Sequence, residues 1–189
     1  MISSSKERNK IHPHKFTLWV GMGSIVMMFA GLTSAYIVRK SQANWLEFQL
    51  PVIFWYSTFV ILLSSLTMYL AVKAFKARQM QQYRILITIT VVLGVLFAGL
   101  QFWGFYFLQN NGVSILWQGS NPSASFLGII TGLHVLHVLG GVVALIIIFL
   151  RAYSMKTKTY NSTALEIVST YWHFVDILWI YLFIFFKWI

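Results

Sequence analysis

The residues best suited to chemistry in this chain lie in its last apolar stretch, which carries Glu166, His173 and Asp176. Ionisable side chains are costly in hydrocarbon, so their presence indicates either a protein partner or a function. At about 100° per residue, the three side chains fall with Ser169 and Thr170 inside an arc of roughly 120°. We therefore predict a helix with one polar face directed at protein and an apolar face directed at lipid or at packing neighbours.

Two histidines, His134 and His137, stand in the preceding apolar stretch. They share a helix face with Gly141, whereas Gly128 and Gly132 lie nearly opposite, so this helix is expected to have close neighbours on two sides. The imidazoles could ligate a haem or a metal, or could be neutral hydrogen-bonding groups in a packed interior. A histidine pair spaced i, i+3 is a weak metal signal, and the spacing favours a structural role.

Depth along the helices favours a polar network. At 1.5 Å per residue, His137, His173 and Asp176 all fall near the bilayer midplane, where they could meet. Glu166 falls about 10 Å nearer the cytoplasm, where partial hydration is expected. We predict a buried polar network formed by His134, His137, Glu166, His173 and Asp176.

The composition indicates an integral membrane protein. Hydrophobic residues make up 58% of the 189 residues, charged residues make up 10%, and the mean hydropathy is +0.72. The net charge of +10 does not indicate nucleic-acid binding, because the basic residues stand in short stretches between apolar runs. The chain has no cysteine, which excludes disulfides, thiolate metal sites and cysteine nucleophiles.

Five apolar runs are long enough to cross a hydrocarbon core of about 30 Å. The predicted fold is therefore an all-α bundle of five transmembrane helices, in a membrane domain 16–189 that follows a cytoplasmic tail, 1–15. Outside these runs, eleven Lys and Arg residues fall on one side of the membrane and three on the other, which predicts a cytoplasmic N-terminus and an external C-terminus. The five predicted spans are 16–38, 51–72, 85–107, 126–150 and 164–186.

Several stretches resemble subunit III of the haem-copper terminal oxidases of the cytochrome c oxidase type. The run Tyr-Trp-His-Phe-Val-Asp-Ile-Leu-Trp at 171–179 closely resembles the tail signature of that family, and Glu166 matches the glutamate before it. Three further stretches agree in the same order: Phe-Ala-Gly at 29–31, Ser-Ser at 64–65, and Thr-Gly-x-His-x-x-His-Val at 131–138.

This resemblance implies an accessory subunit without haem, copper or another redox centre of its own. Its implied partners are catalytic subunit I, which holds the haems and copper, the other oxidase subunits and bound phospholipid. The implied place is the bacterial cytoplasmic (inner) membrane, in aerobic respiration with proton pumping. The implied roles are stabilising the catalytic subunit, binding lipid, and assisting proton uptake or oxygen access.

The chain departs from the family pattern in two ways. Many members have seven spans, and this chain resembles the five-span form, so a lipid cleft between the missing pair and the other helices should be absent or supplied by another subunit. Ile25 and Gly104 stand where the family often has glutamates, although Gln101 matches a family glutamine. Any proton-handling role of those carboxylates is therefore not expected here.

Three alternatives remain at this point. The five-span form also occurs in quinol oxidases, so the chain could be subunit III of a quinol oxidase. A small b-type membrane cytochrome could use two of His134, His137 and His173 as axial ligands. A small transporter could use Asp176 or Glu166 as its ion site, but the chain shows neither broken helices nor repeats.

Overall fold

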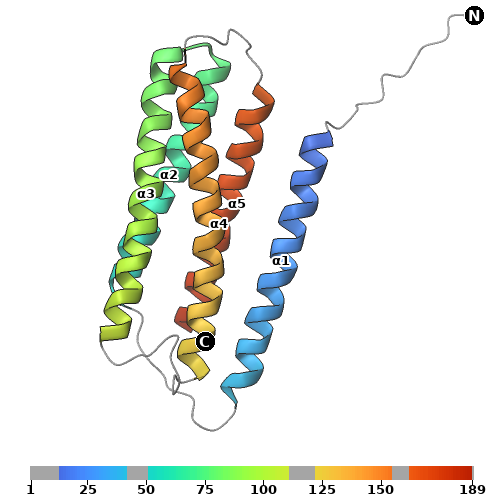
Figure 1. Cartoon of the computed structure of the whole chain (residues 1–189), viewed down its shortest axis with the longest axis vertical. Coiled ribbons are helices and arrows are strands. Elements are labelled where there is room, and N and C mark those ends of the chain that lie inside the picture. The colour runs from blue at the N-terminus through green and yellow to red at the C-terminus, as the bar shows by residue number, and fades with distance from the viewer. Residues whose placement is uncertain (1–12, 42–50, 111–121, 155–161, 189) are drawn as a thin grey trace, which may run out of the picture.

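The chain folds into five long helices. The computed structural model describes residues 13–41, 51–110, 122–154 and 162–188, and within these ranges there is no strand. The helices are α1 (Pro13–Lys40), α2 (Ile53–Lys76), α3 (Met80–Asn110), α4 (Pro122–Tyr153) and α5 (Ser162–Trp188). Figure 1 shows them side by side along one axis, with α1 at the edge of the bundle.

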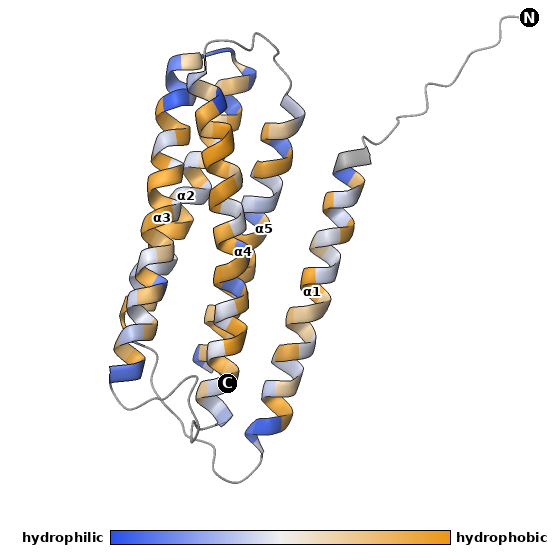
Figure 2. Cartoon of the chain, in the orientation of Figure 1, coloured by the Kyte–Doolittle hydropathy of each residue, from blue (hydrophilic) through white to orange (hydrophobic). Residues whose placement is uncertain are grey.

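All five helices are long and apolar enough to cross a membrane. Figure 2 shows hydrophobic residues along their middle turns and hydrophilic residues mainly near their ends. The predicted all-α membrane bundle is thus confirmed, and every predicted span falls on one of the five helices. The helices extend up to five residues beyond these spans, except that α2 begins two residues late. The predicted 1–15 tail lies outside the described residues, apart from its last three, which begin α1.

Prolines mark the starts of three helices. Pro13 and Pro122 are the first residues of α1 and α4, where the missing N–H of proline costs no hydrogen bond. Pro51 stands just before α2, and its carbonyl accepts a hydrogen bond from the N–H of Phe54 at 3.1 Å.

The connection between α2 and α3 is short. Arg78 adopts a left-handed φ of 57°, and the N–H groups of residues 77–79 donate to carbonyls in the last turn of α2. This places Lys76 and Arg78 at the end of the bundle that also holds Lys15 and Arg151, which we call the basic end.

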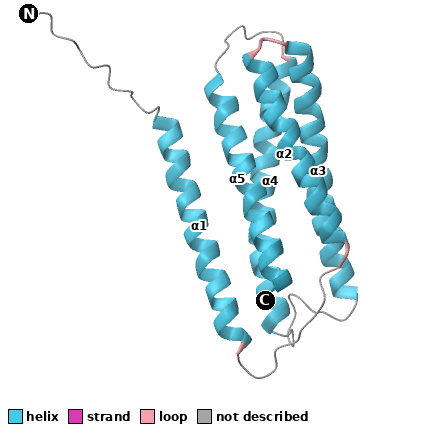
Figure 3. Cartoon of the chain, turned by 180° about the vertical axis from the view of Figure 1, so that it is seen from behind, coloured by secondary structure: helices cyan, strands magenta, loops and turns pink. Residues whose placement is uncertain are grey.

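The helix contacts separate α1 from the other four. Helix α2 contacts α3 and α5, and α4 contacts α3 and α5, whereas α1 contacts only α4 and α5. The view from behind in Figure 3 again places α1 at one edge, with α5 and α4 between it and the α2–α3 pair. The outer side of α5 between α1 and α2 is therefore not covered by another of the described helices.

The centre of the bundle is built around Trp172 of α5. This fully buried side chain packs against glycine backbones on two helices: a Cβ at Gly94 or at Gly141 would lie 2.9 Å from its ring. The indole N–H of Trp172 donates to the Ser64 hydroxyl at 3.2 Å. One aromatic ring thus joins α2, α3, α4 and α5, and only glycine leaves it room.

Candidate functional site

His134 lies in an aromatic enclosure. Its fully buried imidazole stacks on Trp179 at 5.2 Å between ring centroids, and it meets the edges of Phe29 and Phe97 at 6.4 and 6.3 Å. Neither ring nitrogen has a hydrogen-bond partner among the described residues. The packing of this imidazole therefore comes from three aromatic rings contributed by α1, α3 and α5.

His137 is turned toward α1 and toward its own helix. Its Nδ1 lies 2.7 Å from the carbonyl of Leu133, and its ring meets Phe29 at 6.0 Å. The link to α5 at this depth is the hydroxyl of Tyr171, which donates to the backbone carbonyl of His137 at 3.1 Å. Helices α4 and α5 are therefore neighbours, as expected, but they are joined through a backbone group.

His173 pairs with α2. Its Nδ1 lies 2.7 Å from the hydroxyl of Ser65. Asp176, one turn further along α5, is buried, and its carboxyl group lies near the same Ser65 hydroxyl, although neither oxygen has a hydrogen bond of good geometry within the described part of the chain.

Glu166 occupies the basic end of the bundle. Its carboxylate lies 2.8 Å from the ammonium group of Lys15 on α1 and 3.1 Å from that of Lys76 on α2. The Glu166 side chain is 26% exposed, as expected for a partly hydrated group. This one residue connects the ends of three helices.

The five predicted network residues fall into three groups: His134 and His137 share the ring of Phe29, His173 and Asp176 share the hydroxyl of Ser65, and Glu166 lies apart at the basic end. In the described residues, no hydrogen bond or ion pair joins two of these side chains to each other. The reason is the rotation of each helix about its own axis. Side chains that lie at the same depth in the membrane can therefore face different neighbours. The described part of the chain contains no group of three or more His, Asp or Glu residues that could hold a metal ion.

The two positions that lack the family glutamates, Gly104 and Ile25, differ in how much room a larger side chain would have. A Cβ at Gly104 would lie 3.1 Å from the ring of Phe54, so a longer side chain would require Phe54 to move. Gln101, one turn away, is buried and donates to the Ser57 hydroxyl at 3.0 Å, while its amide oxygen has no partner among the described residues. Ile25, in contrast, lines an open groove.

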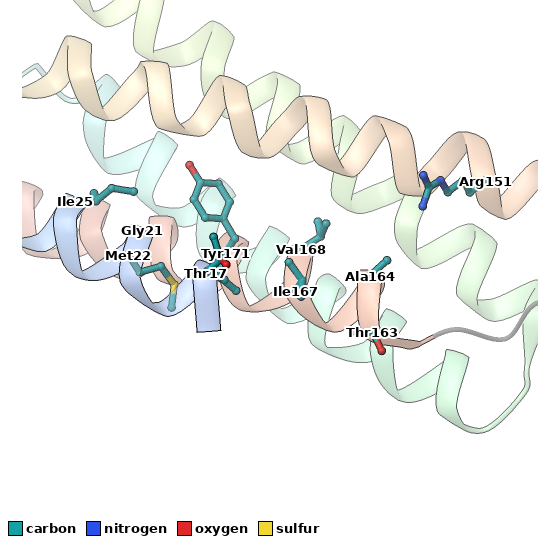
Figure 4. Close-up of a pocket in the computed structure, with 11 residues that line it drawn as sticks. Thr17, Gly21, Met22, Ile25, Arg151, Thr163, Ala164, Ile167, Val168 and Tyr171 are labelled. Atoms are coloured by element: carbon teal, nitrogen blue, oxygen red, sulfur yellow. The ribbon is translucent and has the colours of Figure 1, made fainter. Parts of the chain in front are cut away.

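That groove is a feature that the sequence analysis did not predict. It lies between α1, α4 and α5 near the basic end and has a volume of about 840 Å³. Figure 4 shows its wall of mostly apolar side chains, with Arg151 at one end. The lining residues are Thr17, Leu18, Gly21, Met22, Ile25, Arg151, Thr163, Ala164, Ile167, Val168 and Tyr171.

Comparison with known proteins decides the family. The family model of cytochrome c oxidase subunit III matches residues 43–189. The chain belongs to the cytochrome c oxidase subunit III family. This confirms the resemblance seen in the motifs, and the matched segment contains α2 to α5 but not α1.

Three relatives illustrate the range of the family. A probable cytochrome c oxidase subunit 3 of Nocardia farcinica is 36% identical over 174 residues, covering 87% of this chain and 82% of the relative. Cytochrome c oxidase subunit 3 of Bacillus sp. strain PS3 is 29% identical over 170 residues, covering 87% and 80%. A probable quinol oxidase subunit 3 of Staphylococcus saprophyticus is 30% identical over 176 residues, covering 90% and 86%.

Membership makes this chain a subunit III of a haem-copper oxidase, and so part of an oxidoreductase complex with other subunits. The five helices and the bacterial relatives make it a multi-pass bacterial membrane protein.

Proposed function

We propose that this subunit III is an accessory subunit without a redox centre, which binds and stabilises the catalytic subunit that holds haem and copper. The observation that supports this proposal most directly is that the histidine side chains are already engaged with other residues of this chain. A haem needs imidazoles directed into one shared space, whereas His134 is enclosed by aromatic rings and His173 is bonded to Ser65. These contacts support a structural role and disfavour the b-type cytochrome alternative.

Purification in mild detergent tests this role. A tag on this chain should bring down a haem-copper catalytic subunit, and the haem spectrum should stay with that subunit when the two are separated. Haem or metal that remained stoichiometric with the separated chain would contradict the proposal. Oxidation assays of the purified complex with reduced cytochrome c and with a quinol, each as sole electron donor, distinguish the cytochrome c oxidase from the quinol oxidase alternative.

The proposal places the subunit in the bacterial cytoplasmic membrane with its basic end in the cytoplasm, from the excess of Lys and Arg on that side. The chain lacks cysteine, so single cysteines can report the orientation. Ser41→Cys, at the opposite end, should react with an impermeant maleimide added to intact cells, whereas Ser154→Cys, beside the basic end, should not. The reverse pattern would overturn the orientation.

We also propose that a phospholipid occupies the groove between α1, α4 and α5. The apolar wall fits acyl chains, and the guanidinium of Arg151 at one end fits a phosphate group. This groove would supply a lipid site within the five-span form, without the missing pair of helices.

Native mass spectrometry of the purified complex measures the bound lipid. Arg151→Gln should remove on the order of one retained phospholipid per complex, because it removes the charged hydrogen bonds to the phosphate. Arg39→Gln, at the opposite end of α1, is the matched control and should leave the lipid count unchanged. Equal lipid counts in both variants would reject this site.

A further inference from the structure

The side of α5 that lies between α1 and α2 carries polar groups into the membrane. We call the line where α5 meets α2 on this side the α2–α5 seam, formed by Ser65, Tyr69, His173 and Ile177. Helix α1 does not contact α2, so none of the five described helices covers the seam from outside. Ile177, one turn beyond His173, is 65% exposed, which shows that this side of α5 faces outward.

Two polar groups at the seam have no hydrogen-bond partner within the described part of the chain. The Nδ1 atom of His173 is engaged with Ser65, but no hydrogen bond is found for its Nε2 atom among the described residues. Tyr69, one turn from Ser65 on α2, is 60% exposed, and its hydroxyl likewise lacks a hydrogen bond in the described part. The seam therefore presents two hydrogen-bonding groups outward.

The depth of His173 restricts what can satisfy it. His173 lies eleven helical steps, or about 16 Å, from the first residue of α5, Ser162, which places it well inside a membrane core that is about 30 Å thick. Acyl chains have no hydrogen-bonding atoms at that depth, and an unsatisfied polar group there is costly. A side chain from another membrane helix can reach it and can donate or accept a hydrogen bond.

We infer that the α2–α5 seam is a docking surface for a transmembrane helix of another oxidase subunit, which places a hydrogen-bonding side chain against Nε2 of His173. This inference rests on the proposed function, because it assumes that this chain is assembled into an oxidase. Ile177, one turn from His173, supplies apolar packing surface, and His173 fixes the register of the partner helix.

Photocrosslinking in native membranes tests the surface. Benzoylphenylalanine placed at Ile177 should form an adduct with one other oxidase subunit. Leu136 on α4 is the matched control, because it is 63% exposed, against 65% for Ile177, and lies at a similar depth. It should give lipid adducts only. Adducts of Ile177 with lipid alone, with a second copy of this chain, or with the same subunit at the yield seen from Leu136 would each overturn the inference.

Two variants of His173 test the role of Nε2. Glutamine places an amide near Nε2, and asparagine places one near Nδ1, where it can keep the bond to Ser65. His173→Asn should lower the amount of co-purified partner subunit roughly tenfold, whereas His173→Gln should keep it within about twofold of the natural chain. The opposite order would show that His173 acts only through Ser65.

The outcomes separate this inference from the proposed function. If oxidase subunits co-purify but Ile177 yields only lipid adducts, the docking surface is wrong and the accessory role stands. If no oxidase subunit co-purifies with the natural chain, both fail.

Discussion

Helix α1 and the four-helix unit α2 to α5 are held in place by different means. In the four-helix unit, Trp172 fills a space that two glycines leave open, and its N–H reaches a third helix. Helix α1 instead relies on fewer contacts: the buried rings of Phe29 and Tyr36 against α4 and α5, the hydroxyl pair of Thr33 and Tyr181 at 3.0 Å, and the ion pair of Lys15 with Glu166.

The difference reflects how helices associate in lipid. Lipid tails are as apolar as leucine, so burial of apolar surface adds little, and close packing decides which helices stay together. The most apolar part of α1 is 17% buried, against 44% for α5. The glycine and tryptophan interlock therefore specifies the four-helix unit, while α1 is positioned by separable polar contacts and by the rings of Phe29 and Tyr36.

The largest effect is expected from removing the central ring. Trp172→Ala should destabilise the subunit by about 3 to 5 kcal/mol, because a cavity opens where four helices meet and Ser64 loses its donor. Reversible unfolding in mixed micelles measures the change. Trp19→Ala is the control, since Trp19 is exposed on α1. Equal losses in the two variants would refute the central role of Trp172.

Filling the space beside the ring should have the next largest effect. Gly141→Ala should cost about 1 to 3 kcal/mol, because its Cβ would lie 2.9 Å from the ring of Trp172 and the ring has little room to move. Gly132→Ala on the same helix is the matched control, since a Cβ there meets nothing within 4 Å. The same unfolding assay compares them, and a neutral Gly141→Ala would show that the interlock tolerates a methyl group.

Removing the polar contact in the outer half of α1 should have a smaller effect on stability. Tyr181→Phe removes the hydrogen bond to Thr33, and such bonds between membrane helices are worth about 0.6 kcal/mol on average. Faster hydrogen exchange in α1, with α2 to α5 unchanged, is the expected measurement. Tyr106→Phe, an exposed tyrosine on α3, should leave the exchange of α1 as it was. Uniform exchange in all five helices of Tyr181→Phe would break the distinction between α1 and the rest.

The smallest effect is expected at the basic end. Glu166→Gln removes the ion pairs with Lys15 and Lys76, whose side chains are 42% and 59% exposed. Exposed ion pairs contribute about 0 to 1 kcal/mol, and salt screens them. The exchange rate of the first turns of α1 should rise slightly at low salt and should match that of the natural chain at about 1 M salt. A large effect that persists in high salt would assign Glu166 a role beyond this contact.

Much of the fold could be read from the sequence, because the bilayer imposes a simple rule on it. Twenty or so apolar residues in a row must form a spanning helix, so the five helices and their approximate ends follow from hydropathy. The family motifs could also be recognised from the sequence, because each is a short run of consecutive residues within one of those helices.

The surroundings of the site residues depended on tertiary structure. Counting residues placed His137, His173 and Asp176 at one depth, but depth does not determine which neighbour a side chain faces. The rotation of each helix is set by packing, chiefly by Trp172 against Gly94 and Gly141.

That packing turns both His173 and Asp176 toward Ser65, and it directs His137 to its own helix. The groove beside Ile25 and the uncovered side of α5 likewise arise because α1 contacts α4 and α5 but not α2. The sequence by itself determined which helices exist and what groups they carry, because hydropathy and spacing are local properties. Only the tertiary structure decided which groups meet, because contacts between helices depend on side chains that are far apart in the chain.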